Sequence, residues 1–358
     1  MSQESTRRRF IGASGVGAIG LMAGCTDSLT DDGTESDDTG SDENGDGDDS
    51  DGIDDGIDDG EDVPDLDGGA VVFVYDDGPM EDYDDAFPVH EEFDAPASTG
   101  IVTEWMGRED FNDSDWMDVE HLEELVDAGW EIMSHTTAHT ALGSFELVED
   151  VEPDDERIYP EERNHGFHQG YDIEITDGEE SVLRTVVDSD TDDTGGYLEF
   201  DESVGESFAA GETVERYPED VMHEFLGESK SELESLGFEI DTLLAPYDIV
   251  DDWAIDVARE YYDGIANVNP GSMYNDPDSF DAFDTNRDYF IEFTTPAEVE
   301  ADLEHVAEEE AIGIIGAHTF KEEVTAERIR ETLEWVEDHD LEVLTFREAL
   351  HATGALEG

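Results

Sequence analysis

The stretch AVVFVYDDGP, residues 70–79, joins six largely apolar residues to two aspartates and a Gly-Pro turn. β-Branched and aromatic residues without polar alternation are typical of a strand that is buried on both faces. Such strands occur in parallel sheets covered by helices, and sites form in the loops after their carboxyl ends. The stretch therefore predicts a strand at Ala70–Tyr75 and places Asp76 and Asp77 where a site would be built.

Strand patterns and helical patterns alternate along the rest of the chain. Residues 119–128 place Leu122, Leu125 and Val126 on one helical face, and Gly129 follows as a C-terminal cap. This alternation predicts an α/β fold with a mostly parallel sheet. The predicted strands are 97–102, 130–133, 312–317 and 341–345, and the predicted helices are 252–261, 296–310 and 326–337.

Residues 143–216 interrupt this pattern with short segments of alternating polarity. The clearest are 171–175, 182–187 and 197–200, and glycine-containing turns separate them. Such alternation is typical of antiparallel strands with one buried face. We therefore expect a small β-rich insertion within a main domain that spans residues 70–350.

The charge balance is extreme, with 103 acidic and 15 basic residues among 358 and a formal net charge of −88. The acidic residues run along the whole chain, whereas a tail that binds a cationic partner would be confined to one segment. Salt at about 1 M shortens the Debye length to about 3 Å and screens such repulsion. The composition therefore predicts a protein adapted to very high salt. It offers no basic patch for nucleic acid, and no feature indicates a protein partner.

Residues 1–25 have the pattern of an export signal. Three arginines at 7–9 precede an apolar run at 11–23, which is shorter than the roughly 20 residues that span a bilayer. The arginines resemble a twin-arginine signal, and Met22-Ala23-Gly24-Cys25 resembles a lipobox. We expect export and anchoring to the outer face of the cell membrane by a lipid on Cys25, or secretion if Cys25 is not lipidated. As the single cysteine, Cys25 also excludes a disulfide framework and a cysteine-based zinc site.

Residues 26–69 consist almost entirely of Asp, Glu, Gly, Ser and Thr. Such a segment cannot bury enough apolar surface to offset the entropy of ordering it. The Asp-Gly repeat at 51–60 lacks the ligand spacing and closing glutamate of a helix-loop-helix calcium site. We expect an extended acidic tether between the membrane and the main domain.

A pair of histidines follows the strand predicted at 130–133. In Ser134-His135-Thr136-Thr137-Ala138-His139, the two imidazoles are four residues apart and can face one cation. Neutral imidazole suits zinc and similar divalent ions. With 11 histidines in the chain, two surface histidines at this spacing also arise by chance. In so acidic a chain, the same holds for the Asp76-Asp77 pair.

Two further segments of interest end predicted strands. They are Leu244-Ala245-Pro246-Tyr247, and Ile315-Gly316-Ala317-His318 at the end of an apolar run. Taken alone, His318 could equally be a hydrogen-bonded core residue.

The four segments together, in this order, resemble the polysaccharide deacetylase family, also called the NodB homology domain or carbohydrate esterase family 4. The family pattern is Thr-Phe-Asp-Asp-Gly, then His-Ser/Thr-x-x-His, then Arg-x-Pro-Tyr, then a late Leu-x-His. The resemblance runs from Ala70 to about Leu350, with the insertion between the second and third segments. It implies a distorted, incomplete (β/α) barrel.

The resemblance also implies a role for each matching residue. Asp76 matches the catalytic base and His318 the general acid, while Tyr247 matches the residue whose backbone N–H helps to hold the oxyanion. Zinc is the expected ion, and cobalt, nickel or manganese would suit the same donors. The metal triad of the family matches Asp77, His135 and His139.

The chain departs from the family pattern at several points. Val74-Tyr75 stands where the pattern has Thr-Phe, which is a mild change. Leu244 replaces the arginine that orients the base in the family, and Arg287 is a candidate to supply that charge from elsewhere. The dipeptide Asp252-Trp253 invites assignment to the family's Asp-Trp motif. It lies on a predicted helix and comes too early, so that motif stays unassigned.

The implied activity is hydrolysis of N-acetyl groups on a surface or extracellular polysaccharide, a reaction at a carbon–nitrogen bond other than a peptide bond. Two alternatives stay open. The same site could act on an O-acetyl ester or on another carbon–nitrogen bond. The loss of the arginine would also fit a surface protein that binds glycans through a decayed site.

Overall fold

The computed structural model describes residue 66 and residues 68–355 except residue 113. These residues belong to one compact unit, residues 59–358. The predicted export signal, Cys25 and nearly all of the predicted tether lie outside the described residues. Within the described part of the chain, no helix has the length and apolar character needed to cross a membrane.

The central sheet is built from parallel strands in the order β11-β10-β3-β2-β1-β15-β14-β12. The short β13 (Tyr274–Asn275) pairs antiparallel with β15, and β16 (Glu342–Leu344) pairs with the first half of β1. Among the described residues, no pairing closes the path between β11 and β12. The predicted fold, a distorted and incomplete (β/α) barrel, is confirmed by this arrangement. The path strands are β1 (Ala70–Tyr75), β2 (Ser98–Ile101), β3 (Glu131–Ser134), β10 (Thr242–Leu243), β11 (Gly264–Ile265), β12 (Asn269–Pro270), β14 (Asn286–Tyr289) and β15 (Ile312–Ala317).

The first strand shows why its sequence lacks alternation. All six residues of β1 are fully buried. Val71, Phe73 and Tyr75 pack into one apolar cluster, whereas the intervening residues pack into a second cluster. A strand with core on both faces needs apolar residues at every position.

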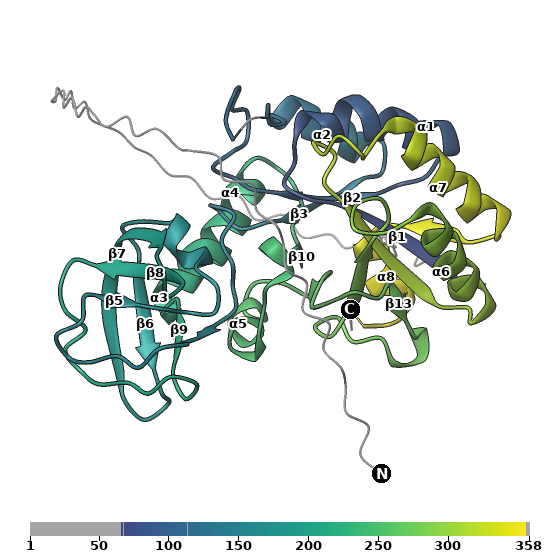
Figure 1. Cartoon of the computed structure of the whole chain (residues 1–358). Helices are drawn as coiled ribbons and strands as arrows, with labels where there is room; N and C mark the ends of the chain where they lie inside the picture. The colour runs from purple at the N-terminus through teal and green to yellow at the C-terminus, as the bar shows by residue number, and fades with distance from the viewer. Residues whose placement is uncertain (1–65, 67, 113, 356–358) are drawn as a thin grey trace, which may run out of the picture. The chain divides into compact units, whose positions relative to one another are not determined.

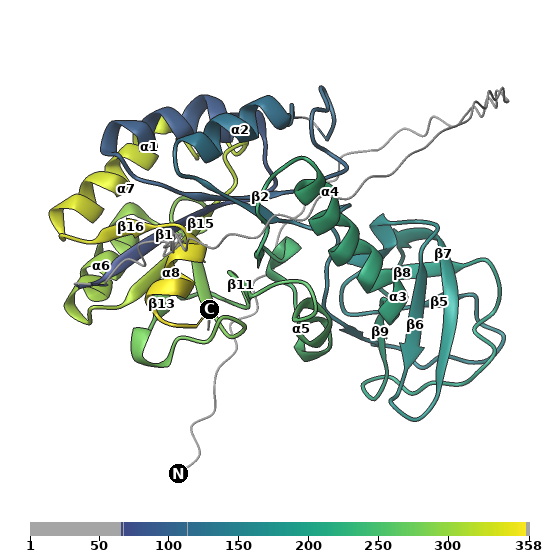
Figure 2. The ribbon, with the colours of Figure 1, turned by 180° about the vertical axis from the view of Figure 1, so that it is seen from behind.

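Helices cover the sheet, and several lie together along one side of it (Figures 1 and 2). In α2, Leu122 and Leu125 are buried, but Val126 is 43% exposed, so its prediction as a core-facing residue was wrong. At 100° per residue, Val126 lies about 70° from the centre of the face formed by the two leucines. The predicted helix at 252–261 ends early, at Ala258. Six of the helices are α1 (Phe87–Phe93), α2 (Val119–Asp127), α5 (Asp252–Ala258), α6 (Pro296–Glu308), α7 (Ala326–Asp338) and α8 (Phe346–Ala352).

Residues 145–216 contribute a separate six-stranded antiparallel sheet in the order β4-β9-β6-β7-β8-β5 (Figure 1). In β6, the buried Ile173 and Ile175 alternate with the exposed Asp172 and the half-buried Glu174, as the sequence pattern predicts. The alternation is incomplete in β8, where the adjacent Tyr197 and Leu198 are both buried. After this sheet, α3 (Glu219–His223), the π-helical η3 (Glu224–Glu228) and α4 (Ser229–Ser235) lead back to β10. The strands are β4 (Phe145–Glu146), β5 (Arg157–Ile158), β6 (Asp172–Thr176), β7 (Ser181–Thr191), β8 (Gly196–Phe200) and β9 (Val214–Arg216).

Candidate metal centre

Three of the predicted site residues meet at the carboxyl ends of the strands. Asp77 follows β1, and His135 and His139 follow β3. The Nε2 atoms of both histidines lie 3.0 Å from Oδ1 of Asp77. One ligand atom from each residue falls within 4.8 Å of the others, and all three side chains are buried. The structure therefore brings together the whole predicted metal triad.

The chemistry of these donors fits a divalent cation. Nδ1 of His135 lies 2.7 Å from the carbonyl oxygen of Leu244. Because a carbonyl can only accept, Nδ1 donates to it, which leaves Nε2 as the ring nitrogen available to a metal ion. Burial raises the pKa of Asp77, but its two histidine neighbours hold that pKa well below its usual range, so the carboxylate is charged. Burial also lowers the pKa of His139, which favours the neutral ring that metals bind.

The predicted base, Asp76, is held by an arginine from a distant part of the chain. Nη1 of Arg287 donates to Oδ2 of Asp76 at 3.1 Å, and Nη2 contacts Oδ1. Nη1 also donates to Asp248 at 3.0 Å. Burial lowers the pKa of Arg287, but the charges of Asp76 and Asp248 raise it by more than burial lowers it. The net pKa is therefore raised, and the guanidinium stays charged. Arg287 thus places a positive charge beside Asp76, whereas Leu244 is fully buried beside His135.

Gly316 makes room for this arginine. It lies on β15, opposite Tyr289 of β14, and a Cβ added at position 316 would overlap the Arg287 guanidinium. Any larger residue at position 316 must therefore displace the group that holds Asp76.

The predicted acid, His318, also lies close to Asp76. Its Nε2 is 3.9 Å from Asp76 Oδ2, and its Nδ1 is 2.8 Å from Glu292 Oε1, which also accepts from the His318 backbone N–H. Burial lowers the pKa of His318, but Asp76 and Glu292 outweigh it and raise the pKa to about 9. Sequence analysis missed Glu292, which is 2% exposed, because one glutamate among many carries no pattern.

Replacing Glu292 by glutamine tests this assignment. The amide oxygen of glutamine can still accept hydrogen bonds from the backbone N–H and from Nδ1 of His318, but the negative charge is lost. Because that charge raises the pKa of His318, we expect the variant to lose its protonated acid at lower pH. The basic limb of the pH–activity profile should move down by on the order of one unit. A Glu298→Gln variant, on the surface of α6, should leave the profile unchanged. An unshifted limb in Glu292→Gln would contradict the acid role of His318.

Aromatic rings border the triad. Tyr247 adopts a left-handed backbone conformation, with φ of 63°, and its exposed ring lies 4.4 Å from that of His139. Trp105 approaches the same imidazole at 5.0 Å. The role of the Tyr247 backbone N–H stays a prediction. Trp253 lies in α5 with the Arg216 guanidinium 4.1 Å from its ring centre.

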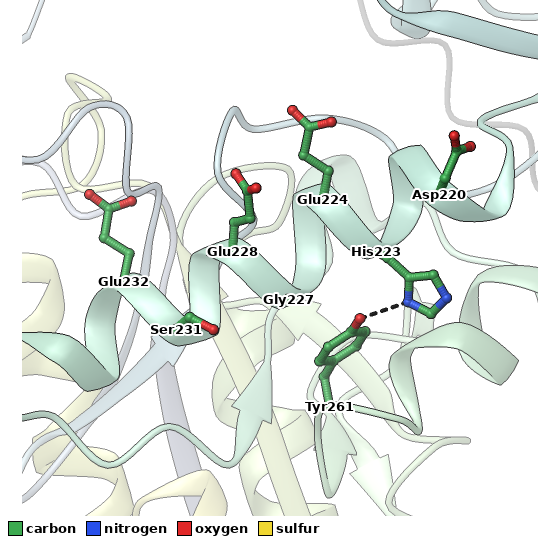
Figure 3. Close-up of a pocket in the computed structure, with 8 residues that line it drawn as sticks. All are labelled: Asp220, His223, Glu224, Gly227, Glu228, Ser231, Glu232 and Tyr261. Atoms are coloured by element: carbon green, nitrogen blue, oxygen red, sulfur yellow. Dashed lines mark hydrogen bonds between the residues drawn. The ribbon is translucent and has the colours of Figure 1, made fainter.

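A separate hollow of about 760 Å³ lies along α3, η3 and α4 (Figure 3). Its carboxylates line one side of a continuous helical ribbon, while His223 bonds to Tyr261 at 2.7 Å on the other. None of the triad residues lines it. In a chain this acidic, a row of exposed carboxylates is expected on most surface helices. We therefore assign no site to this hollow. The lining residues are Asp220, His223, Glu224, Gly227, Glu228, Ser231, Glu232 and Tyr261.

The fold and the donor set define an incomplete α/β barrel with a carboxylate–dihistidine centre at the ends of its strands. Residues 64–165 match a family model described as "Polysaccharide deacetylase". This range includes Asp76 and the metal triad, but it covers less than a third of the chain and ends before His318. None of the curated proteins matches the chain.

Several solved structures are similar at low identity. One is a mutant of the peptidoglycan deacetylase PdaC from Bacillus subtilis (10% identity, TM-score 0.42, covering 81% of this chain and 94% of that one). A second is a family 4 acetyl xylan esterase from Clostridium thermocellum with a cobalt ion (11%, 0.42, 80% and 92%). A third is a family 4 carbohydrate esterase from Streptomyces lividans with acetate (9%, 0.42, 76% and 91%). The fold assignment depends on the strand order and not on these similarities.

Proposed function

We propose that this protein is a metal-dependent deacetylase that removes N-acetyl groups from a surface or extracellular polysaccharide. The observation that carries the proposal is the meeting of Asp77, His135 and His139 in one buried cluster, with Asp76 and His318 beside it. The match of residues 64–165 to the polysaccharide deacetylase model supports the same reaction.

The triad would hold one divalent ion, with zinc expected and cobalt, nickel or manganese also suited to the donors. Such an ion supplies Lewis-acid polarisation of a carbonyl and acidification of water. Asp76, oriented by Arg287, takes the proton from the water that adds to the acetamide carbon. His318 gives its proton to the nitrogen as the C–N bond breaks, which yields acetate and a free amine. Base and acid thus start in opposite protonation states, and the Tyr247 backbone N–H is proposed to bind the oxyanion.

We also propose that the protein is exported and anchored to the outer face of the cell membrane through a lipid on Cys25. The arginine-rich start, the short apolar run and the sequence Met22-Ala23-Gly24-Cys25 support this location. An acidic surface of this density suits a protein that works in very high salt.

Acetate release from a panel of substrates in molar KCl tests the reaction. We expect release from N-acetylglucosamine oligomers or from the organism's own exopolysaccharide, and little from an O-acetylated xylan oligomer. Preferential release from the O-acetyl ester would assign the site to an esterase. Binding of the oligomers without any release would favour a decayed glycan-binding protein, the alternative that Leu244 suggested and that Arg287 beside Asp76 argues against.

A further inference from the structure

The loop that carries the metal ligands, residues 135–142, is under backbone strain. We call it the ligand loop. Thr136 and His139 have φ of 65° and 53°, in the left-handed region that residues other than glycine rarely adopt. Such conformations cost on the order of 1–3 kcal/mol each and persist only where surrounding contacts hold them. The orientation of His139 therefore depends on whatever holds this loop.

Two histidines of the β-rich insertion contact the ligand loop directly. His165 lies within η2 (Asn164–Phe167), a single 3-10 turn between β5 and β6, and His168 directly follows it. Nε2 of His165 lies 3.0 Å from the carbonyl oxygen of Ala141, and Nε2 of His168 lies 3.3 Å from that of His139. Because both partners are carbonyls, both imidazoles donate. One of these bonds ends on the backbone of a metal ligand itself.

His165 is in turn fixed to the sheet of the insertion. Its Nδ1 lies 2.8 Å from Oε2 of Glu215 on β9, and both side chains are completely buried. Its ring packs 4.2 Å from that of Tyr217, whose hydroxyl accepts a 2.8 Å hydrogen bond from Thr140 in the ligand loop. A buried side chain bonded at both ring nitrogens has little freedom to reorient.

The packing of η2 against the sheet sets the position of both histidines. Gly166 lies so close to β7 and β8 that an added Cβ would meet the Ser189 side chain and come within 2.6 Å of Leu198 Cδ2. This close packing fixes the position of η2 on the sheet. The sheet therefore determines where the two imidazoles contact the ligand loop.

We propose that the insertion, together with Tyr217 directly after it, is a brace for the metal centre. His165, His168 and Tyr217 are positioning residues that hold the ligand loop so that His139 faces Asp77. This inference rests on the metal binding of the proposed function. It assigns a purpose to the segment that separates the two histidine ligands from the later site residues. Outer-shell hydrogen bonds to metal-ligating side chains typically contribute 10- to 100-fold to metal affinity, and the bonds described here act on the backbone that carries His139.

Metal affinity of the full chain tests the brace. Metal-free protein in molar KCl would be titrated with Zn²⁺ against a chromophoric chelator, and the visible spectrum of Co²⁺ would report the ligand geometry. His168→Phe keeps a ring against Phe225 but loses the N–H, and we expect Zn²⁺ affinity to fall by on the order of 10-fold or more and the Co²⁺ bands to shift. Tyr217→Phe, which removes the partner of Thr140, should weaken binding less. His168→Gln, which retains a donor, should recover part of the loss.

A matched control comes from the same turn. Phe167 is 54% exposed, so Phe167→Ala should bind both ions like wild type. Wild-type affinity and Co²⁺ spectra in both His168→Phe and Tyr217→Phe would overturn the brace, as would a wild-type protein that binds neither ion. Should His168→Phe fail to fold without metal, Tyr217→Phe and His168→Gln still decide the matter. If wild type binds Zn²⁺ but releases no acetate from any substrate, the proposed reaction is wrong. The Zn²⁺ affinities of the variants relative to wild type still test the brace.

Discussion

A Gly316→Ala variant is expected to keep its metal ion and to lose at least about 100-fold in kcat/KM for acetate release. The added methyl group would overlap the Arg287 guanidinium, which bonds to both oxygens of Asp76. A displaced arginine leaves the base misoriented and its buried charge poorly compensated. Neither Gly316 nor Arg287 belongs to the metal triad, so the metal content should be unchanged.

The same strand offers a control for the general effect of a glycine substitution. A Cβ at Gly313 would meet only side chains, the nearest being Val306 Cγ2 at 3.3 Å, so Gly313→Ala should retain most of its activity. In an Arg287→Met background, adding Gly316→Ala should cost little more, because the group it displaces is already gone. Full activity in Gly316→Ala, or an equal loss with and without Arg287, would contradict the account.

A His135→Ala variant is expected to lose both the bound ion and the activity. His135 supplies one of three ligands, and its Nδ1 bond to Leu244 fixes the ring that presents Nε2. The several kcal/mol of transition-state stabilisation that a metal provides corresponds to a loss of about 1,000-fold or more. The orphaned Leu244 carbonyl should also lower the free energy of unfolding by about 1–3 kcal/mol.

Metal analysis after gel filtration and acetate assays in molar KCl would measure both effects. His305→Ala is the control, because that histidine stacks on Tyr274 from α6 and lies outside the triad. A His135→Ala protein with a full complement of metal would show that the triad is assigned wrongly.

The sequence predicts those parts of the structure that local patterns encode. The uninterrupted apolar run of β1 identifies a strand with core on both faces, and strand ends then locate Asp77, His135 and His318. These residues are far apart in the sequence. They meet because parallel strands present their carboxyl ends at one edge of the sheet.

What the sequence leaves open depends on contacts between distant segments. Arg287 could be suspected, but its bond to Asp76 depends on the pairing of β14 with β15 and on the space at Gly316. Glu292 is one of many acidic residues, and only the fold brings it to His318. The contact of His168 with the ligand loop likewise depends on how η2 packs against the insertion's sheet, for which no local pattern exists.

The most direct test of the central claim is to measure metal content and acetate release on one wild-type preparation in molar KCl, with N-acetylglucosamine oligomers as substrate. We predict about one divalent ion per chain and steady acetate release. A chelator should remove both, and added Zn²⁺ or Co²⁺ should restore both. Acetate release that persists after the ion is removed, or a chain that binds no divalent ion, would contradict a deacetylase built on Asp77, His135 and His139.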